Sequence, residues 1–300
     1  MRRILPIGVA LLALAAAGCG GGGGKARITA DGSSTVGPLV TVAAERFEDA
    51  DITVGISGTG GGFERFCAGE TDLSSASRPI EDEEAATCRK SGVGYVALQV
   101  ANDALTVVVN PANDWATCLT VAQLKRIWEP GSTVRAWRDL DPSFPGERVA
   151  LFGAGTDSGT FDYFTKEIVG EEGSSRSDYQ ASEDDNVTVQ GVSGEKGGLG
   201  YFGFSYYEEN QDKLRAVAID GGNGCVEPSV ENAQTGRYQP LSRPLFVYAK
   251  RASLERPEVV AFLRFLLDNE ADIAQTARFV PLTDAQLIQA KSALDQATSA

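Results

Sequence analysis

Residues 26–47 read ARITADGSSTVGPLVTVAAERF and contain a strand pattern, a loop and a helix pattern in direct succession. Apolar residues alternate at Ala26, Ile28 and Ala30, as on one face of a strand. The loop at 31–38 is rich in small and hydroxyl residues, and the helix pattern follows it at once. Such a junction gathers unpaired N–H groups at the positive end of a helix dipole. It predicts an α/β unit whose loop is either a small-anion site or a simple helix cap.

The rest of the 300-residue chain continues this alternation. Apolar runs predict strands at 52–56, 95–100, 105–109, 149–152, 214–219 and 245–248. Helical spacing predicts helices at 121–128, 161–168, 257–267 and 283–294, the last with Thr283 as N-cap. Alternating strands and helices favour an α/β fold with a mainly parallel sheet, and the length suits two lobes.

The N-terminus has the pattern of an export signal. A basic start, Met1-Arg2-Arg3, precedes an apolar stretch at 4–17 that is too short to span a bilayer. The stretch ends in Ala-Ala-Gly-Cys19, which resembles the lipobox of bacterial lipoproteins, with Ala16 where Leu is commonest. We expect residues 1–18 to be a signal peptide, Cys19 to be lipidated and residues 19–24 to form a glycine tether. The alternative is an ordinary signal peptide cleaved nearby.

Four further cysteines, Cys67, Cys88, Cys118 and Cys225, follow the signal. In an exported protein they can form two disulfides in three possible pairings, and the alternative is buried free thiols. None has CxxC spacing, which argues against zinc and redox roles.

The composition excludes several function classes. The chain has no histidine, so a Ser-His-Asp triad and His-ligated metals are absent. The formal net charge of −14 argues against a nucleic-acid partner. Any anion site must therefore work through local donors and dipoles against an unfavourable overall field.

Four turns share a glycine- and hydroxyl-rich composition, and they lie at 33–35, 57–63, 74–79 and 155–161. Glycine lets the backbone approach a ligand closely, and Ser and Thr each donate one rotatable hydroxyl proton. One such turn is weak evidence, but several in one chain indicate an oxyanion cage. No turn fits GxxxxGK[ST], so a nucleotide is not indicated.

These residues together resemble the PstS-type phosphate-binding lipoproteins of phosphate ABC transporters. The resemblance rests on DGSSTV (31–36), GTGGGFERF (58–66), DLSSASRPI (72–80) and DSGTF (157–161). It continues in order through 104–111, 127–130, 182–192, 198–207 and 243–250. It therefore spans nearly the whole chain after the signal.

The resemblance implies a type II periplasmic-binding fold, in which two α/β lobes are joined by two crossover strands and close on a ligand between them. One lobe would comprise residues 25–100 and 244–300, and the other residues 101–243. The pairing Cys67–Cys88 and Cys118–Cys225 is then favoured, because each disulfide would stay within one lobe.

The resemblance also implies a ligand set. The matching positions are Ser34, Thr35, the N–H of Val36, Thr59, Ser158, Gly159 and Thr160. Two positions depart from well-known members, which have an aspartate where this chain has Ser77 and an arginine where it has Ala154.

These departures leave two roles to fill. Arg78 is our candidate for the missing cation, although it could instead form a salt bridge at the rim. Asp157 is the first candidate for the acceptor of a ligand proton, and Asp31 is the second. Either aspartate could instead cap a helix or stabilise its own turn.

The function implied is the capture of inorganic phosphate for an ABC importer by a non-enzymatic, monomeric receptor on the outer face of the cytoplasmic membrane. The expected partners are phosphate, the membrane permease and, through the lipid on Cys19, the membrane. We expect no cofactor and no metal. The main alternative keeps the fold but takes sulfate, molybdate or tungstate. A surface phosphatase is disfavoured by the missing histidine, and a sensory ectodomain would need a separate transducer.

Overall fold

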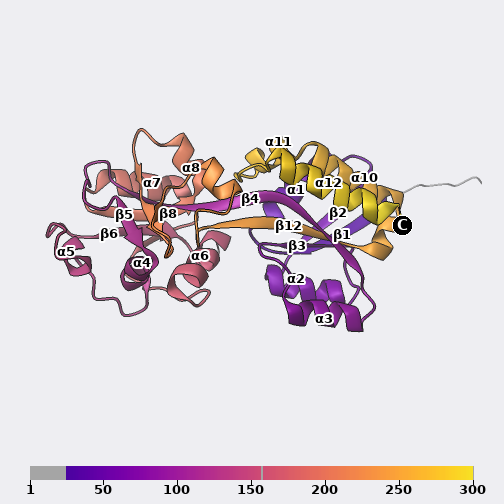
Figure 1. The fold of residues 1–300 in the computed structure, drawn as a ribbon, viewed down its shortest axis with the longest axis horizontal. Helices are drawn as coiled ribbons and strands as arrows, with labels where there is room; N and C mark the ends of the chain where they lie inside the picture. Colours follow the sequence, from indigo (N-terminus) through magenta and orange to yellow (C-terminus); the bar gives the residue numbers. More distant parts are fainter. Residues whose placement is uncertain (1–24, 157, 300) are drawn as a thin grey trace, which may run out of the picture.

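The computed structural model describes residues 25–156 and 158–299. The predicted signal peptide, Cys19 with its tether, and Asp157 lie outside these residues. Figure 1 shows two lobes side by side, connected by long strands. The first lobe and the segments that return to it contain β1 (Ala26–Gly32), α1 (Gly37–Arg46), β2 (Ala50–Ile56), α2 (Gly58–Cys67), β3 (Leu73–Ala76), α3 (Asp82–Lys90), η2 (Arg251–Glu255), α10 (Pro257–Asp268), α11 (Glu270–Thr276) and α12 (Asp284–Thr298).

The second lobe holds the middle of the chain. Its elements are β5 (Cys118–Thr120), α4 (Val121–Trp128), α5 (Trp137–Leu140), β6 (Ala150–Ala154), α6 (Gly159–Phe164), the π-helix η1 (Thr165–Val169), β7 (Gln180–Ser182), α7 (Asp185–Gly194), β8 (Gly198–Gly203), α8 (Phe204–Glu209), β9 (Arg215–Ala216), β10 (Ala218–Asp220), β11 (Cys225–Val226) and α9 (Val230–Gln234). The first lobe is called lobe I below and the second lobe II.

Two strands, β4 (Tyr95–Val109) and β12 (Ser242–Lys250), run between the lobes and pair with each other antiparallel. The prediction of separate strands at 95–100 and 105–109 is wrong, because β4 continues through both. The polar residues Asn102 and Asp103 interrupt the apolar pattern, yet both are buried. Their partners come from distant parts of the chain: Asn102 donates to Pro281 and Gln286, and Asp103 pairs with Arg243.

The main sheet has the order β2-β1-β3-β12-β4-β8-β6-β7, with β9 paired to β4. The outer strands of each lobe are parallel, as in β1–β2 and β6–β8. The prediction of a mainly parallel sheet is nevertheless wrong, because β12 and β4 pair antiparallel with each other and with their neighbours β3 and β8. Antiparallel pairing arises at the crossovers, since the chain passes between the lobes in both directions.

Each lobe has its own hydrophobic core. In lobe I, α1, α10 and α12 cover one sheet face and α2 and α3 the other (Figure 1), and large buried side chains include Phe63 and Phe262. In lobe II, Trp128 and Trp137 are buried among α4, α5 and the sheet. Each close-packed core provides a rigid support for the loops of its own lobe that face the other lobe.

Both favoured disulfides are present, Cys67–Cys88 in lobe I and Cys118–Cys225 in lobe II.

The helix predicted at 121–128 has these bounds, and Thr120 and Gln123 form its capping box. Thr283 caps α12 as expected. The strand predicted at 214–219 is divided into β9 and β10, which belong to different sheets. Within the described part of the chain, no helix is both long and apolar enough to cross a bilayer.

Candidate functional site: an oxyanion pocket between the lobes

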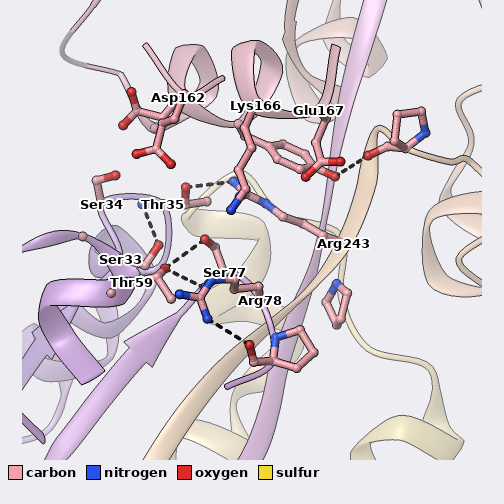
Figure 2. A pocket seen from close by; sticks show the side chains of 18 of the residues that line it. Ser33, Ser34, Thr35, Thr59, Ser77, Arg78, Asp162, Lys166, Glu167 and Arg243 are labelled. Atoms are coloured by element: carbon pink, nitrogen blue, oxygen red, sulfur yellow. Dashed lines mark hydrogen bonds between the residues drawn. The ribbon is translucent and has the colours of Figure 1, made fainter. Parts of the chain in front are cut away.

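A cavity of about 620 Å³ lies where the two lobes and β12 meet (Figure 2). Its walls come from three loops of lobe I, from the α6–η1 segment of lobe II and from the start of β12. The lining residues are Ser33, Ser34, Thr35, Ser57, Gly58, Thr59, Gly60, Gly61, Ser77, Arg78, Pro79, Gly159, Asp162, Tyr163, Lys166, Glu167, Glu172, Gln239, Pro240, Ser242, Arg243 and Pro244. Six of the predicted site residues are among them: Ser34, Thr35, Thr59, Ser77, Arg78 and Gly159.

The loop between β1 and α1 is held in shape by Ser33. The Oγ atom of Ser33 accepts hydrogen bonds from the N–H groups of Thr35 and Val36, at 3.2 and 3.3 Å. Ser34 and Thr35 line the cavity. Val36 is fully buried, does not line the cavity and directs its N–H toward Ser33, so its contact with a ligand stays a prediction.

The second and third loops of lobe I are joined by Thr59 and Ser77. The hydroxyl of Thr59 accepts from the Ser77 N–H at 3.2 Å and lies 3.1 Å from the Ser77 hydroxyl. Only one of the two hydroxyl protons is needed for their mutual bond, so the other proton can be donated to a ligand. These contacts hold the two loops together before any ligand arrives.

Arg78 lines the cavity, but acidic partners in lobe I already hold its guanidinium group. Glu84 accepts two hydrogen bonds from it, at 2.7 and 2.8 Å, and Glu81 lies 3.3 Å from its Nε. Hydrogen bonding to Glu84 is the main reason why the pKa of Arg78 is raised. A bidentate pair of this kind neutralises much of the charge that an anion would use.

Arg243 is a cavity residue that the sequence analysis did not single out. Its Nη2 donates to Thr35 Oγ1 at 2.9 Å, its Nε lies 3.1 Å from Asp103, and its guanidinium stacks 3.6 Å from the ring centre of Tyr163. It therefore contacts lobe I, the crossover β4 and lobe II from its own position on β12. Because Thr35 accepts from Arg243, the hydroxyl proton of Thr35 is available to a ligand.

In lobe II the predicted Ser-Gly-Thr turn contributes only Gly159 to the lining. Ser158 and Thr160 are not lining residues, because Ser158 caps α6 and its Oγ accepts from the Thr160 N–H at 3.1 Å. A Cβ on Gly159 would lie 2.7 Å from Thr35 Oγ1, 3.0 Å from Ser34 Oγ and 3.2 Å from the Thr35 N atom. The absence of a side chain at Gly159 thus leaves space next to three polar atoms of the first loop.

The two aspartates proposed as proton acceptors lie elsewhere. Asp31 is buried beneath the first loop, where it forms an ion pair with Arg65 and accepts from Ser57 at 2.7 Å. It does not line the cavity. Asp157 is outside the described residues. The carboxylates that line the cavity are instead Asp162, Glu167 and Glu172, all on lobe II.

Asp162 and Lys166 are further lining residues that the sequence analysis missed, and Figure 2 shows them on the wall above Ser34 and Thr35. Helical spacing from Gly159 could have located Asp162, because residues three apart share a helix face. Nothing local in the sequence could have identified Arg243, since its partners lie 140 and 208 residues away.

The chemistry of the cavity is that of a binding site. Neutral hydroxyl donors from lobe I, the cation Arg243 and a gap at Gly159 surround a space suited to a small oxyanion. Ser242 adds a buried hydroxyl on the lining, and this hydroxyl has no hydrogen-bond partner among the residues described. In residues 25–156 and 158–299, no three Cys, Asp or Glu side chains are grouped to hold a metal ion.

Comparison with known proteins agrees with this architecture. The family described as the PBP superfamily domain matches residues 20–270. Protein SphX of Synechococcus elongatus is 48% identical over 265 residues, which cover 86% of this chain and 78% of SphX. The phosphate-binding protein PstS of Staphylococcus saprophyticus is 38% identical over 277 residues, 90% of this chain and 85% of that protein.

A crystal structure of a possible phosphate-binding protein from Planctomyces limnophilus has 46% identity to this chain and a TM-score of 0.86. The match covers 91% of this chain and 99% of that one. It confirms the two-lobed fold for almost the full length of a solved relative. The chain belongs to the PBP superfamily and, within it, to the family of PstS-type phosphate-binding proteins.

Proposed function

We propose that this protein captures inorganic phosphate in the cavity between its lobes and delivers it to an ABC importer. The observation that carries this proposal is the convergence of Thr35, Arg243 and Gly159 on one point between the lobes. The hydroxyl and the guanidinium can both donate hydrogen bonds to a tetrahedral oxyanion, and the missing side chain at Gly159 leaves space beside them. These polar groups offer no contact surface to an apolar ligand.

The position of Arg243 also supports a receptor that closes on its ligand. Arg243 lies on a crossover strand and contacts groups of both lobes, so an anion bound to it would be placed at the hinge. Closure of two lobes around a ligand is a common motion in proteins of this architecture. A binding role of this kind needs no nucleophile or general base.

Export and lipid anchoring belong to the same proposal. The chain starts with a basic and apolar stretch, followed by Cys19 and five glycines. These features would hold the described part of the chain at the outer face of the cytoplasmic membrane. In membrane fractionation, Cys19→Ser should release the protein from the membrane. Continued membrane association of that variant would contradict lipidation at Cys19.

Calorimetric titration of the purified protein with phosphate, sulfate and molybdate tests the ligand assignment. We expect one phosphate per chain and no heat from sulfate or molybdate at the same concentrations. If molybdate or sulfate binds in preference to phosphate, the proposed ligand is wrong, although the fold assignment stands. Turnover of p-nitrophenyl phosphate by the purified protein would contradict the receptor role and favour a hydrolase.

A further inference from the structure

Arg278 follows α11 in a backbone conformation that arginine rarely adopts. Its φ is 67°, and among the residues that the structure describes it is the one non-glycine residue with a positive φ. The N–H groups of Arg278 and Phe279 donate to the carbonyls of Gln275 and Ala274, at 3.0 and 2.8 Å, which is the Schellman arrangement at a helix end. Glycine is the usual residue at this position, because a side chain is disfavoured there. A residue in such a conformation persists where its surroundings hold it in place, as they often do at functional contacts.

The side chain of Arg278 reaches from lobe I to lobe II. Its neighbours Ala277 and Phe279 pack against the core of lobe I. The guanidinium group nevertheless forms an ion pair with Glu209 and lies 5.0 Å from the ring centre of Tyr206, and both of these residues belong to α8 of lobe II.

The backbone of Arg278 is also held by lobe II. The hydroxyl of Ser205, at the start of α8, donates to the Arg278 carbonyl at 2.6 Å. Three kinds of contact therefore join the end of α11 to α8: a hydrogen bond, an ion pair and a cation–π contact. The four residues Ser205, Tyr206, Glu209 and Arg278 are called the clasp below.

The residues that follow the clasp are fixed to a crossover strand and to lobe II. Val280 exchanges two backbone hydrogen bonds with Asn102 of β4, at 2.8 and 2.9 Å, and its side chain is buried in the core of lobe II. Gln234 of α9 donates to the Pro281 carbonyl at 2.9 Å. The segment between α11 and α12 is thus a third path of contact between the lobes, in addition to β4 and β12.

The clasp lies away from the cavity. Figure 1 shows α8 and α11 above the crossover strand β4, whereas α2 and α6, whose first turns help to line the cavity, lie below it. None of the four clasp residues is a lining residue. The same structure holds Gly159 of lobe II against the first loop of lobe I. The clasp is therefore formed while the two walls of the cavity are close together.

We propose that the clasp stabilises this arrangement of the lobes and thereby sets how tightly the protein holds its ligand. Rotation of one lobe about the crossover strands moves α8 relative to α11, so the clasp contacts are lost when the walls separate. The apparent affinity for a ligand that needs both walls is proportional to the fraction of molecules whose walls are together. Arg278 is then a positioning residue, which acts on the ligand through the lobes and without touching it.

The strength of the clasp suits a receptor that must also release its ligand. The side chains of Arg278 and Glu209 are each about half exposed, so their ion pair is weak. A clasp of this kind changes the balance between the lobe arrangements severalfold and still allows a ligand to enter and leave.

Small-angle X-ray scattering and calorimetric titration with phosphate test the clasp. Without ligand, Arg278→Ala and Glu209→Gln should each have a larger radius of gyration than the wild-type protein, and saturating phosphate should restore the wild-type value. Both variants should bind phosphate about two- to fivefold more weakly. Because the two side chains contact each other, the double variant should lose less affinity than the product of the two single losses.

Arg264→Ala is the matched control. Arg264 pairs with Asp295 and both side chains are about half exposed, but both residues belong to lobe I. The radius of gyration and the phosphate affinity of this variant should equal those of wild type.

Arg278→Gly separates the clasp from the strained backbone. It should match Arg278→Ala in scattering and in phosphate affinity, because both variants lack the side chain. It should nevertheless melt at a higher temperature than Arg278→Ala, because glycine adopts a positive φ without strain. The same thermal unfolding measurements check that every variant is folded.

The outcomes separate the clasp from the proposed function, on which only the phosphate measurements rest. Wild-type scattering and affinity in Arg278→Ala and Glu209→Gln would overturn the clasp, as would the same changes in Arg264→Ala. Tighter phosphate binding in Arg278→Ala would also overturn it, since the clasp would then hold the walls apart. The scattering comparison without ligand tests the clasp even if the wild-type protein binds no phosphate, a result that would overturn the proposed function instead.

Discussion

The two walls of the cavity differ in how their polar groups are used. On lobe I, Thr59 is bonded to Ser77 and Arg78 is held by Glu84. On lobe II, Asp162 and Lys166 have no such partner among the described residues. The lobe I wall is therefore fixed before the ligand arrives, and the lobe II wall has charges that a ligand can satisfy.

This difference has an energetic consequence. A wall whose donors are already oriented loses little side-chain entropy on binding, whereas free charges gain most from a ligand. Lobe I would receive the anion first and lobe II would close over it. Arg243 already links the two lobes, because it contacts Thr35 of lobe I and Tyr163 of lobe II.

The largest effect should come from Arg243→Ala. We expect phosphate affinity to fall at least about 100-fold, roughly 2.7 kcal/mol, because the variant removes a cation that contacts both walls. Calorimetry measures this loss. Unfolding must be monitored in parallel, because the variant also leaves the buried Asp103 unpaired.

Arg237→Ala is the control for Arg243, since it removes an exposed arginine from the same segment and should change affinity less than about twofold. Arg78→Ala should cost less than Arg243→Ala, because Glu84 holds Arg78 through two hydrogen bonds, whereas Asp103 holds Arg243 through one and Arg243 also donates to Thr35. A greater loss from Arg78→Ala would restore Arg78 as the main ligand cation.

Gly159→Ala tests the point where the walls meet. Its new methyl would lie 2.7 Å from Thr35 Oγ1 and would occupy the space next to the hydroxyl donors. We expect phosphate affinity to fall about tenfold or more, while the melting temperature changes little. Gly194→Ala in α7 is the matched control, because its Cβ would meet nothing within 4 Å. Equal affinity in both variants would contradict the assigned binding point.

Glu84→Gln should release Arg78 from its bidentate pair. The lobe I wall would then have a charged group without a carboxylate partner, as the lobe II wall does. Glutamine can keep the capping box of α3, in which Glu84 accepts from the Glu81 N–H. We expect phosphate to bind about three- to tenfold more tightly, because a freed guanidinium can turn to the ligand. Weaker binding in calorimetry would show that the Arg78–Glu84 pair positions the site.

The contrast between paired and unpaired acids extends beyond the cavity, and it predicts a small effect on stability. In lobe I, burial alone would raise the pKa of Asp72, but hydrogen bonds from Thr29 and Ser253 and the charge of Arg256 lower it overall. In lobe II, burial and then the charges of Asp184 and Glu183 raise the pKa of Asp185 to about 6.

The folded state therefore binds a proton at Asp185 more tightly than the unfolded chain, and the contribution of Asp185 to stability rises as pH falls from above 6 toward 4. Asp185→Asn should raise the free energy of unfolding at pH 7 by about 1–2 kcal/mol, or a few degrees in melting temperature. The advantage should vanish near pH 4, where the wild-type carboxyl is protonated. Thermal unfolding at both pH values measures it, and a benefit that persists at pH 4 would exclude the carboxylate charge as its cause.

Local signals explain which features could be predicted from the sequence. The helix at 121–128 and the cap at Thr283 follow from short-range spacing and capping residues, and both are confirmed. The hydroxyl loops at Ser34, Thr59 and Ser77 could be located for the same reason. Each depends on a glycine- or serine-rich turn beside a strand or helix end.

The features that were missed depend on contacts between distant residues. The strand β4 is interrupted in sequence by Asn102 and Asp103, whose partners come from α12 and β12. Arg243 becomes a site residue only because the crossover places it beside Thr35. The roles predicted for Ser158 and Thr160 stay predictions, since a serine before a helix can cap that helix as well as bind an anion.

A crystal structure of the purified protein with bound phosphate would show where the ligand lies. We expect one phosphate between the lobes, with its oxygens within hydrogen-bond distance of the Thr35 hydroxyl, Arg243 and Lys166, and next to Gly159. Phosphate held by lobe I and Arg78 alone, or bound outside this cavity, would contradict it.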